Sequence, residues 1–371
     1  MDQLFVAVKT FHYKEIEKAN YMFSVKHVVR KSVKGIPGAY GLLVWFIGLP
    51  GKIRNIKYRI VVKKLLNETE LRRKISQLDK IVESPKNKTY YIIRRDCASI
   101  GLFTYVALFL GHIAYAVGKG YIPVIDMKNY PSMYLNDDAS GKENAWEYYF
   151  KQPYNSNLDA IIRNEKYILS PTRIQPMSPF IQSVFSDKES LFWKTLSKKY
   201  IVLSDVAEKY INDECTRLIK PNMKVLGVLF RGTDYAKGKP FGHPIQPTIN
   251  EFIKKVAELE NEWGGFDYIY VATEERAAVE ELEKIFPNKI LVNQRKYYDN
   301  LGIDFSRFNL SEVSFDREND NKLKGFEYLS SIFILSRCHS FIGCLCAGTY
   351  AVNYLNPNSF EHAYFFFKGK Y

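Results

Sequence analysis

The 371-residue sequence lacks the short motifs that mark several common enzyme families. It contains no G-x-x-x-x-G-K-[ST] loop, G-x-G-x-x-G turn, H-E-x-x-H helix or G-x-S-x-G elbow. These motifs belong to P-loop NTPases, dinucleotide-binding enzymes, zinc proteases and α/β-hydrolases, because each one places specific groups around a phosphate, a metal or a nucleophile. Their absence excludes the usual forms of these four classes.

Cysteine is also scarce, and the five residues are irregularly spaced at Cys97, Cys215, Cys338, Cys344 and Cys346. An odd number in a long chain argues against a disulfide framework and favours a reducing compartment. The first thirty residues show no clean apolar run before a small-residue cleavage site, so we expect no secretory signal peptide. A zinc site formed by Cys338, His339, Cys344 and Cys346 is less favoured than buried thiols, because C-x-C is not the usual zinc spacing.

Acidic residues are few at the start of the chain. The first 80 residues hold 17 Lys and Arg against 6 Asp and Glu, a net charge of +11 out of +13 for the whole chain. The apolar run 35–51 has five glycines and two prolines in 17 residues, which makes it a poor membrane-spanning helix. Residues 1–85 are therefore predicted to be a basic N-terminal segment. It either contacts an anionic membrane surface or contains a buried hairpin followed by a solvated helix.

Beyond this segment, short β-branched or aromatic runs alternate with helical patterns, which predicts an α/β fold with parallel sheets. The polar stretch 219–224, with a proline and an asparagine, reads as a boundary. We expect two facing Rossmann-like domains, residues 86–220 and residues 221–371. The predicted strands are Thr89–Arg95, Tyr121–Asp126, Tyr167–Ser170, Val225–Phe230, Tyr268–Thr273, Lys289–Asn293 and Ser340–Cys344.

Polar residues follow several of these strands, where ligands of open α/β sheets usually bind. Arg231 has the planar fork that suits two phosphate oxygens, and Gly348 and Thr349 open a helix whose N–H groups favour an anion. Thr273 and Glu274 follow the next strand, although capping of the following helix would account for both. An ion pair of Arg231 with Asp234 or Glu274 would merely brace the loop. Asp126 is either a ligand-facing carboxylate or a turn cap.

The segments Leu229–Tyr235 (LFRGTDY), Gly242–Pro247 (GHPIQP), Tyr268–Glu275 (YIYVATEE) and Tyr328–Asn356 resemble the donor half of the fucosyltransferase superfamily, which includes α1,2-, α1,6- and protein O-fucosyltransferases. The resemblance extends roughly from Thr89 to Tyr371. Leu229 stands where the family often has histidine, so the role of that histidine is not transferred to this chain.

The resemblance implies a GT-B fold, with residues 86–220 as the acceptor-side domain and 221–371 as the donor-binding domain. It also implies GDP-fucose as donor, inversion at the anomeric carbon, and no cofactor or obligatory metal. It implies that Arg231 holds the β-phosphate and that Asp234 orders the loop or contacts the ligand. Thr273 and Glu274 would lie near the nucleoside, and Ala347, Gly348 and Thr349 beside the diphosphate. His243 would hydrogen-bond a sugar hydroxyl or tie its loop to the core.

The chemistry of an inverting transfer predicts a preorganised positive site for the leaving diphosphate and a base for the acceptor hydroxyl. Arg231, Asp234 and Asp126 form the predicted catalytic set. Glu274 and His243 are further candidates for the base, and a carboxylate is favoured. The expected acceptor is a glycan or lipid-linked oligosaccharide at the cytoplasmic face of a membrane, in surface polysaccharide synthesis. The alternatives are a non-catalytic or differently specific sugar-nucleotide-binding protein and, more remotely, a nucleic-acid-binding protein that uses the basic N-terminus.

Overall fold

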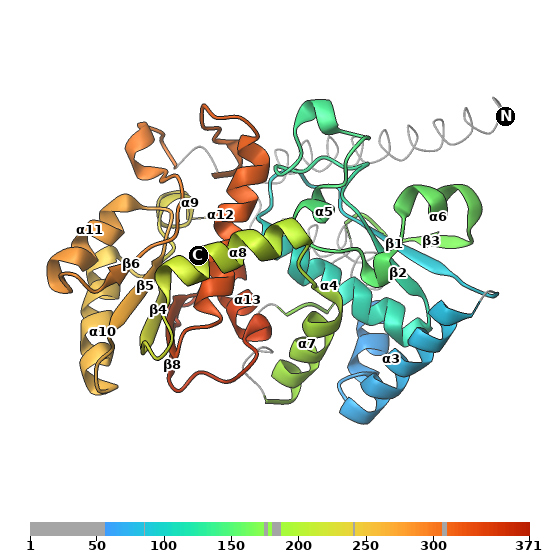
Figure 1. Ribbon diagram of the computed structural model, residues 1–371, viewed down its shortest axis with the longest axis horizontal. Helices are drawn as coiled ribbons and strands as arrows, with labels where there is room; N and C mark the ends of the chain where they lie inside the picture. Colours follow the sequence, from blue (N-terminus) through green and yellow to red (C-terminus); the bar gives the residue numbers. More distant parts are fainter. Residues whose placement is uncertain (1–55, 85, 174–176, 180–186, 240–241, 306–309) are drawn as a thin grey trace, which may run out of the picture. The chain divides into compact units, whose positions relative to one another are not determined.

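The computed structural model describes residues 56–84, 86–173, 177–179, 187–239, 242–305 and 310–371 (Figure 1). The predicted membrane-contacting run 35–51 lies outside the described residues, as does most of the predicted basic N-terminal segment. From Tyr58 to Tyr371 the chain forms one compact unit. This unit contains two parallel β-sheets, one on each side of the predicted boundary at 220, so the expected α/β class is confirmed.

The first sheet has three parallel strands in the order β2-β1-β3. They are β1 (Tyr90–Arg94), β2 (Ile122–Asp126) and β3 (Tyr167–Leu169). All three were predicted to within two residues, because each is a short β-branched or aromatic run. Side-chain amides cover the outer edge of β2: Gln152 Oε1 accepts from Ile125 N–H at 2.9 Å, and Asn144 Nδ2 donates to Ile125 O at 2.9 Å.

The second sheet has five parallel strands in the order β6-β5-β4-β7-β8. They are β4 (Val225–Leu229), β5 (Tyr268–Ala272), β6 (Ile290–Leu291), β7 (Ser340–Cys344) and β8 (Ala363–Phe366). The first four were predicted, whereas β8 was not. Because the strands are parallel, β4, β5 and β7 bring their carboxyl ends to the same edge. Arg231, Glu274 and Gly348 all follow strands that end there.

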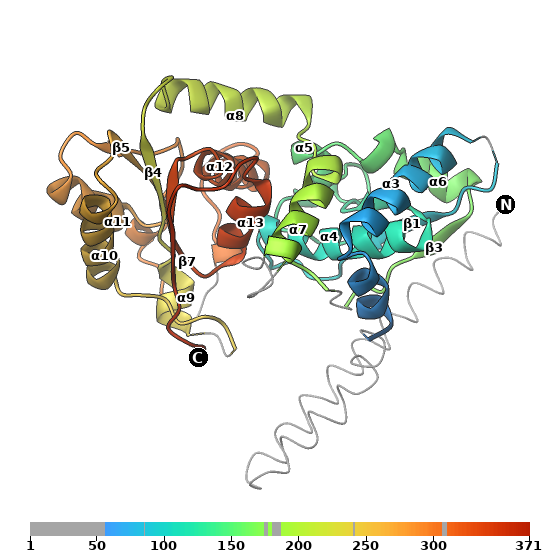
Figure 2. The ribbon, with the colours of Figure 1, turned by 90° about the horizontal axis from the view of Figure 1, so that it is seen from below.

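Helices connect the strands and cover both sheets (Figures 1 and 2). They are α3 (Glu68–Glu83), α4 (Leu102–Lys119), α5 (Ala145–Tyr149), α6 (Leu158–Asn164), α7 (Asp187–Tyr200), α8 (Asp205–Leu218), α9 (Thr233–Gly238), α10 (Ile249–Glu262), α11 (Arg276–Ile285), α12 (Asp320–Leu335) and α13 (Ala347–Leu355). Local sequence explains their starts. Thr248, for example, begins α10 with a reciprocal capping box to Glu251.

Both faces of the second sheet are buried, as the alternation along β4 shows. Val225 and Leu229 pack into one core with α12 and α13, whereas Leu226 and Val228 pack on the other side against α10 and α11. The helix α4 is apolar all round and is long enough to cross a bilayer, but most of its residues are buried in the protein. This pattern is typical of a helix in the centre of a large core.

One hydrophobic core joins the two sheets. It contains β1 and α4 of the first half together with β4, α12 and α13 of the second half. At this junction a Cβ on Gly325 of α12 would overlap the hydroxyl of Tyr149 in α5. Tyr149 Oη donates to Lys322 O at 2.9 Å, which fixes the ring against α12. Glycine is therefore required at position 325 for this close approach.

Candidate functional site

The centre of the candidate site is an ion pair between residues that follow neighbouring strands. Arg231 Nη1 lies 2.8 Å from Glu274 Oε1, and the two side chains are 20% and 7% exposed. Arg231 comes two residues after the end of β4, and Glu274 two residues after the end of β5. The two strands pair in register, with Leu229 opposite Ala272, so the sheet itself brings these side chains together.

Glu274 also holds the loop that follows β4. Its Oε1 accepts from Gly232 N–H at 3.1 Å and from Thr233 Oγ1–H at 2.8 Å. Thr233 has a φ of +38°, an uncommon value for a β-branched residue, and the bonds to Glu274 keep it there. A Cβ on Gly232 would overlap the carboxylate of Glu275, so a larger residue here would force that side chain to move. Bracing of the loop, one of the readings open from the sequence, is therefore present.

Glu275 is a second carboxylate beneath the same loop. Its Oε1 accepts from Thr233 N–H at 2.5 Å. Burial raises the pKa of Glu275; the bond from Thr233 N–H opposes this shift, and the charges of Glu274 and Asp299 add to it. Glu275 is also the N-cap of α11, which begins at Arg276. The expectation that Thr273 caps this helix is therefore wrong by two positions; Thr273 Oγ1 instead accepts from Glu275 N–H at 3.2 Å.

The charge of Arg231 affects the pKa values of a cysteine at the start of α13 and of two tyrosines. Burial raises the pKa of Cys346, the N-cap of α13, and the nearby Arg231 charge opposes that shift. The same two influences act on the pKa values of Tyr328 in α12 and Tyr134 in the first half. Tyr134 Oη accepts from Leu102 N–H, at the start of α4, at 2.6 Å. Arg231 thus lies where both halves contribute side chains.

The start of α13 is built for close packing and is not closed by a side-chain cap. The Cys346 side chain makes no regular N-cap hydrogen bond, but its Sγ lies 3.6 Å from Thr349 Oγ1 in the first turn of α13. A Cβ on Gly348 would lie 2.9 Å from both Tyr328 Oη and Ile332 Cδ1, so only glycine fits without a shift. Thr349 is fully buried, and its hydroxyl donates to Cys344 O. The N–H groups of the first turn and the Arg231 charge together favour an anion at this point.

Tyr235 and His243 lie on the outer side of Arg231. The guanidinium carbon of Arg231 is 4.8 Å from the centre of the Tyr235 ring. The exposed His243 ring meets the Tyr235 ring edge to face, with centroids 5.2 Å apart. His243 O accepts from Tyr371 N–H at 3.1 Å, which joins its loop to the C-terminus. Arg231 is therefore held by Glu274 on one side and by an aromatic face on another.

Two predicted carboxylates have different outcomes. Asp234 lies in the first turn of α9, and its side chain is outside the described part of the structure. Asp126 is buried at the end of β2, and its Oδ1 accepts from Lys128 N–H and Asn129 N–H, each at 3.0 Å. Asn129 Nδ2 lies 3.1 Å from the other oxygen, Oδ2. Asp126 therefore performs the turn-capping role in this structure.

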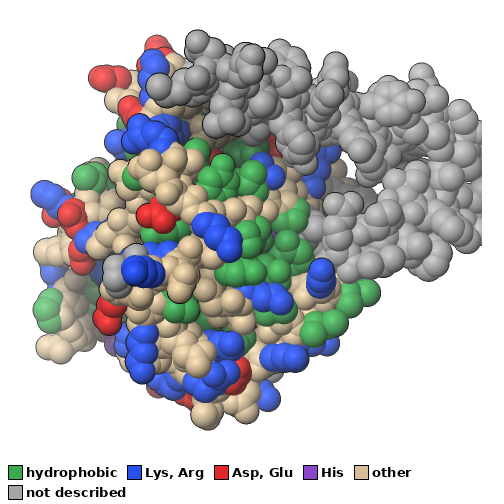
Figure 3. All heavy atoms as spheres, turned by 90° about the vertical axis from the view of Figure 1, so that its right-hand side faces the viewer, with side chains coloured by type: hydrophobic (Ala, Val, Ile, Leu, Met, Phe, Trp, Pro, Cys, Tyr) green, Lys and Arg blue, Asp and Glu red, His purple; other side chains and the backbone are tan. Residues whose placement is uncertain are grey.

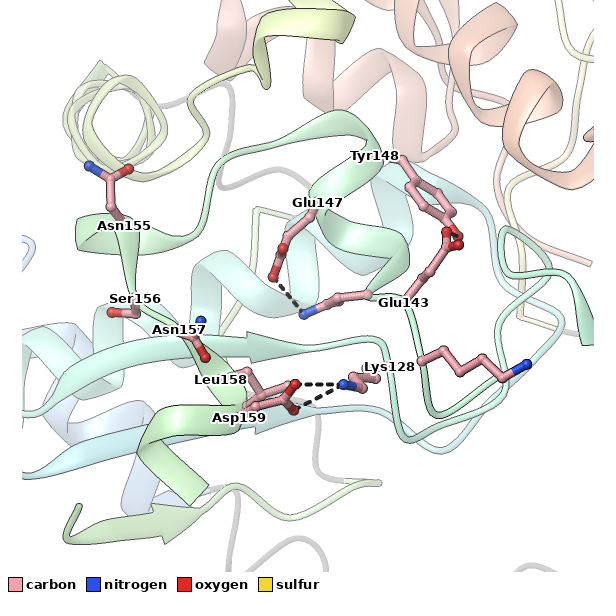
Figure 4. Close-up of a pocket in the computed structure, with 11 residues that line it drawn as sticks. Lys128, Glu143, Glu147, Tyr148, Asn155, Ser156, Asn157, Leu158 and Asp159 are labelled. Atoms are coloured by element: carbon pink, nitrogen blue, oxygen red, sulfur yellow. Dashed lines mark hydrogen bonds and ion pairs between the residues drawn. The ribbon is translucent and has the colours of Figure 1, made fainter. Parts of the chain in front are cut away.

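A polar hollow of about 410 Å³ lies in the first half, beside the edge of β2 (Figure 4). The ion pair of Lys128 Nζ with Asp159 Oδ2, at 2.7 Å, crosses one end of it. At another side Tyr148 Oη donates to Glu143 Oε2 at 2.5 Å. Arg231 and Glu274 do not line this hollow. It is therefore separate from the strand-end site described above.

Four of the five cysteines are buried, and Cys97 is partly exposed. All five lie within the described residues, and none forms a disulfide. Cys338 Sγ donates to Ile334 O at 3.4 Å, and His339 Nδ1 accepts from Val225 N–H at 3.2 Å. Across the described part of the chain, no three His, Cys, Asp or Glu side chains are grouped as a metal site would need.

Sequence reasoning missed Tyr134, Tyr328 and Glu275. The tyrosines carry no local signal, because Tyr134 belongs to a loop and Tyr328 to the middle of α12. Glu275 did have a signal in the sequence, namely its position beside Glu274 at the end of a predicted strand. When a loop packs over two adjacent carboxylates, at least one of them is expected to be buried, and its pKa is then raised.

No protein-family model matches this sequence, and no curated protein matches it. Solved structures similar to this one include those of fucosyltransferases. The α-1,6-fucosyltransferase NodZ soaked with GDP-fucose has 14% identity and a TM-score of 0.46, with 73% of this chain and 94% of that chain covered. NodZ from Bradyrhizobium has 13% identity and a TM-score of 0.45, with coverages of 72% and 93%. POFUT1 in complex with GDP-fucose has 11% identity and a TM-score of 0.40, with coverages of 76% and 99%.

Proposed function

We propose that this protein is an inverting glycosyltransferase that moves fucose, or a related sugar, from GDP-fucose to a hydroxyl group of a glycan acceptor. The observation that carries the proposal is the position of Arg231. It follows β4, is oriented by Glu274 at 2.8 Å, and acts electrostatically on the N-cap residue of α13. The strand-end motifs that resemble fucosyltransferases contain all of these residues. The donor diphosphate would bind between Arg231 and the first turn of α13.

The proposed mechanism concentrates on the leaving group. When the bond to the sugar breaks, the GDP diphosphate gains negative charge while the sugar becomes oxocarbenium-like. Arg231 and the N–H groups of Gly348 and Thr349 would stabilise that charge without reorganising, which is worth about 2–4 kcal/mol per donor in comparable sites. The Cys346 thiol stays neutral because burial raises its pKa, so it would not repel the diphosphate.

Glu274 would act as a positioning residue. Its Oε1 holds both the guanidinium and the Gly232 N–H, so the arginine and its loop move together. A fixed planar fork favours two-point binding of phosphate oxygens, which an ammonium group does not provide. The ion pair is therefore compatible with donor binding as well as with bracing the loop.

The base for the acceptor hydroxyl is proposed to be a carboxylate at the carboxyl edge of the strands. Glu275 joins the predicted candidates Asp126, Asp234, Glu274 and His243, because a raised pKa brings a carboxyl group closer to the working range of a general base. Asp126 and Glu274 each accept several hydrogen bonds already, so their oxygens are occupied with holding the loops around them.

We also propose that the protein works at the cytoplasmic face of a membrane, on a lipid-linked or surface glycan. The first 80 residues supply a net charge of +11. The side of the molecule on which β3 and α6 lie shows hydrophobic side chains among many Lys and Arg (Figure 3). The exposed apolar residues Ile162, Tyr167, Ile168 and Leu169 belong to these two elements or adjoin them. Flotation with phosphatidylglycerol vesicles, compared with phosphatidylcholine vesicles, tests this part.

Calorimetry with a panel of nucleotide sugars tests the main proposal. GDP-fucose should bind and UDP-glucose should not, and turnover on glycan acceptors should continue in the presence of a chelator because Arg231 and α13 supply the positive site. Tighter binding of UDP-glucose would overturn the donor assignment. If chelator abolished turnover and magnesium or manganese restored it, the proposal that Arg231 and α13 stabilise the leaving diphosphate without a metal would be overturned. Donor binding without turnover on any glycan would favour a sugar-nucleotide-binding protein.

A further inference from the structure

Arg95 in the first half is a buried cation that the proposed donor site does not use. It follows Arg94, the last residue of β1, at the carboxyl edge of the first sheet. Its Nε and Nη1 atoms are buried and have no hydrogen-bond partner among the described residues. Arg95 as a whole residue is only partly buried. An unpaired buried guanidinium is strongly unfavourable and calls for a compensating group.

The charges around Arg95 leave it short of a counterion. The titratable groups that face it are Asp96, Cys97, Tyr105 and Arg173. Asp96 Oδ2 is already engaged by Arg173 Nη2, at 3.1 Å. Burial raises the pKa of Tyr105, so its hydroxyl stays neutral. Two guanidinium groups therefore share one described carboxylate.

The neighbouring Arg94 is not part of this cluster. Its Nε donates to Ser170 O at 2.7 Å, and its Nη1 donates to Tyr130 Oη at 2.6 Å. Both contacts tie β1 to its surroundings, as expected of a structural arginine. Arg95, one position later, has no such contacts in the described structure. The hydrogen bonds of Arg94 and their absence at Arg95 Nε and Nη1 suggest that Arg95 binds a ligand that is not part of this chain.

The loop that follows Arg95 leads to α12, because a Cβ on Gly101, at the end of this loop, would lie 3.8 Å from Tyr328 Cε1. Tyr105 is within electrostatic range of both Arg95 and Tyr134. Tyr134 is in turn within range of Arg231. Ligands of parallel sheets bind at this edge of the strands.

We propose that Arg95, assisted by Arg173, binds an anionic group of the acceptor, either the carboxylate of an acidic sugar or a phosphate. This inference rests on the proposed function, because it assigns the acceptor class of that same reaction. Arginine is suited to both groups, since its planar N–H donors match paired oxyanion oxygens. The acceptor of this enzyme is accordingly an acidic or phosphorylated glycan rather than a neutral one.

Kinetics on matched acceptors test the assignment in the full-length protein. A neutral glycan is compared with the same glycan bearing one glucuronic acid and with its phosphorylated form. For Arg95→Gln the KM of the preferred charged acceptor should rise about 30- to 300-fold, the loss typical of a charge-assisted pair. The Kd of GDP-fucose should stay within about 2-fold, since Arg231 is untouched. Arg95→Lys should recover part of the loss, and Arg173→Gln should raise KM about 5-fold.

Lys209→Gln is the control for loss of a surface positive charge, because Lys209 is an exposed cation on α8. It should behave as wild type. A direct readout is calorimetry with glucuronic acid and with methyl phosphate, with GDP filling the donor site; Arg95→Gln should abolish binding of whichever probe binds wild type. The two probes distinguish the two sources of the anion.

Three results would overturn the assignment. They are equal use of neutral and charged acceptors, absence of binding for both probes, and a fall in melting temperature with equal loss on all acceptors for Arg95→Gln. The last result would mean that Arg95 is a structural cation satisfied by water. Failure of GDP-fucose to bind wild type would instead overturn the proposed function, and the probe titrations without GDP would still report on Arg95.

Discussion

Arg231 and Glu274 form an ion pair of 2.8 Å across the ends of two adjacent parallel strands. The pair has two separable consequences, orientation of a guanidinium and support of the loop that carries it. Arg231→Lys keeps a positive charge beside Glu274 but removes the planar fork. Its turnover should fall by about 30- to 1000-fold, or about 2–4 kcal/mol, while its melting temperature stays close to that of wild type.

Arg231→Ala is the matched comparison for this prediction. It leaves the nearly buried Glu274 carboxylate without its cation, so we expect it to lose about 1–3 kcal/mol of stability as well as activity. Donor affinity, turnover and thermal melting are measured for both variants. A fully active Arg231→Lys protein would show that the pair only braces the loop.

Gly348→Ala should weaken donor binding by about 10-fold or more, because the added methyl group forces the start of α13 away from Tyr328 and Ile332. The control is Gly101→Ala, whose Cβ would meet its nearest neighbour, also in Tyr328, at 3.8 Å. Calorimetry with GDP measures both variants. Equal affinities for GDP would show that the diphosphate does not use this helix start.

Glu275→Gln should change how stability depends on pH. The pKa of Glu275 is raised in the folded state, so folding takes up a proton between the ordinary carboxyl pKa and that higher value. Its contribution is fully present below the ordinary value and is lost as the pH rises through the folded pKa. The variant should therefore lose less stability than wild type across this window.

Urea denaturation from pH 4 to pH 8 measures this difference, with the exposed Glu262→Gln as control. A steeper loss in the variant than in wild type would contradict the raised pKa. If Glu275 is also the acceptor base, the variant should lose turnover at every pH while it still binds GDP.

Gly325→Ala should destabilise the protein by about 1–3 kcal/mol, because α12 cannot approach α5 with a methyl group against the Tyr149 ring. In the double variant Gly325→Ala/Tyr149→Ala the two losses should not add, since the second change removes the overlapping group. Chemical denaturation of the four proteins gives the coupling free energy. Additive losses would mean that the helices separate without strain.

Most strands, and therefore their ends, were predictable because local composition determines where a strand forms. Short runs such as Val225–Leu229 and Tyr268–Ala272 are apolar on both faces, as strands covered by helices on both sides must be. Strand β8 was missed because Ala363–Phe366 is one short run near the end of the chain, and its pairing with β7 is a tertiary event. Periodicity therefore located the elements but not the last member of the sheet.

The contacts within the site were harder to predict. The sequence left open an ion pair of Arg231 with Asp234 or with Glu274. The structure shows the pair with Glu274, which strand register brings close, and the Asp234 side chain lies outside the described residues. Asp126 looked equally suited to a ligand or a turn, and the side chain of Asn129 decided for the turn. Such choices depend on distances between segments that are remote in the sequence.

The core shared by the two sheets has a consequence for how the protein loses its structure. Because β1, α4, α12 and α13 pack into one cluster, neither half can expose its part of that cluster without removing support from the other. Calorimetric unfolding should show a single peak, and a fragment that ends near residue 220 should not fold. GDP bound at the second half should slow amide hydrogen exchange in β1 as well. Binding at the second sheet would thus be detectable as greater protection of the first sheet.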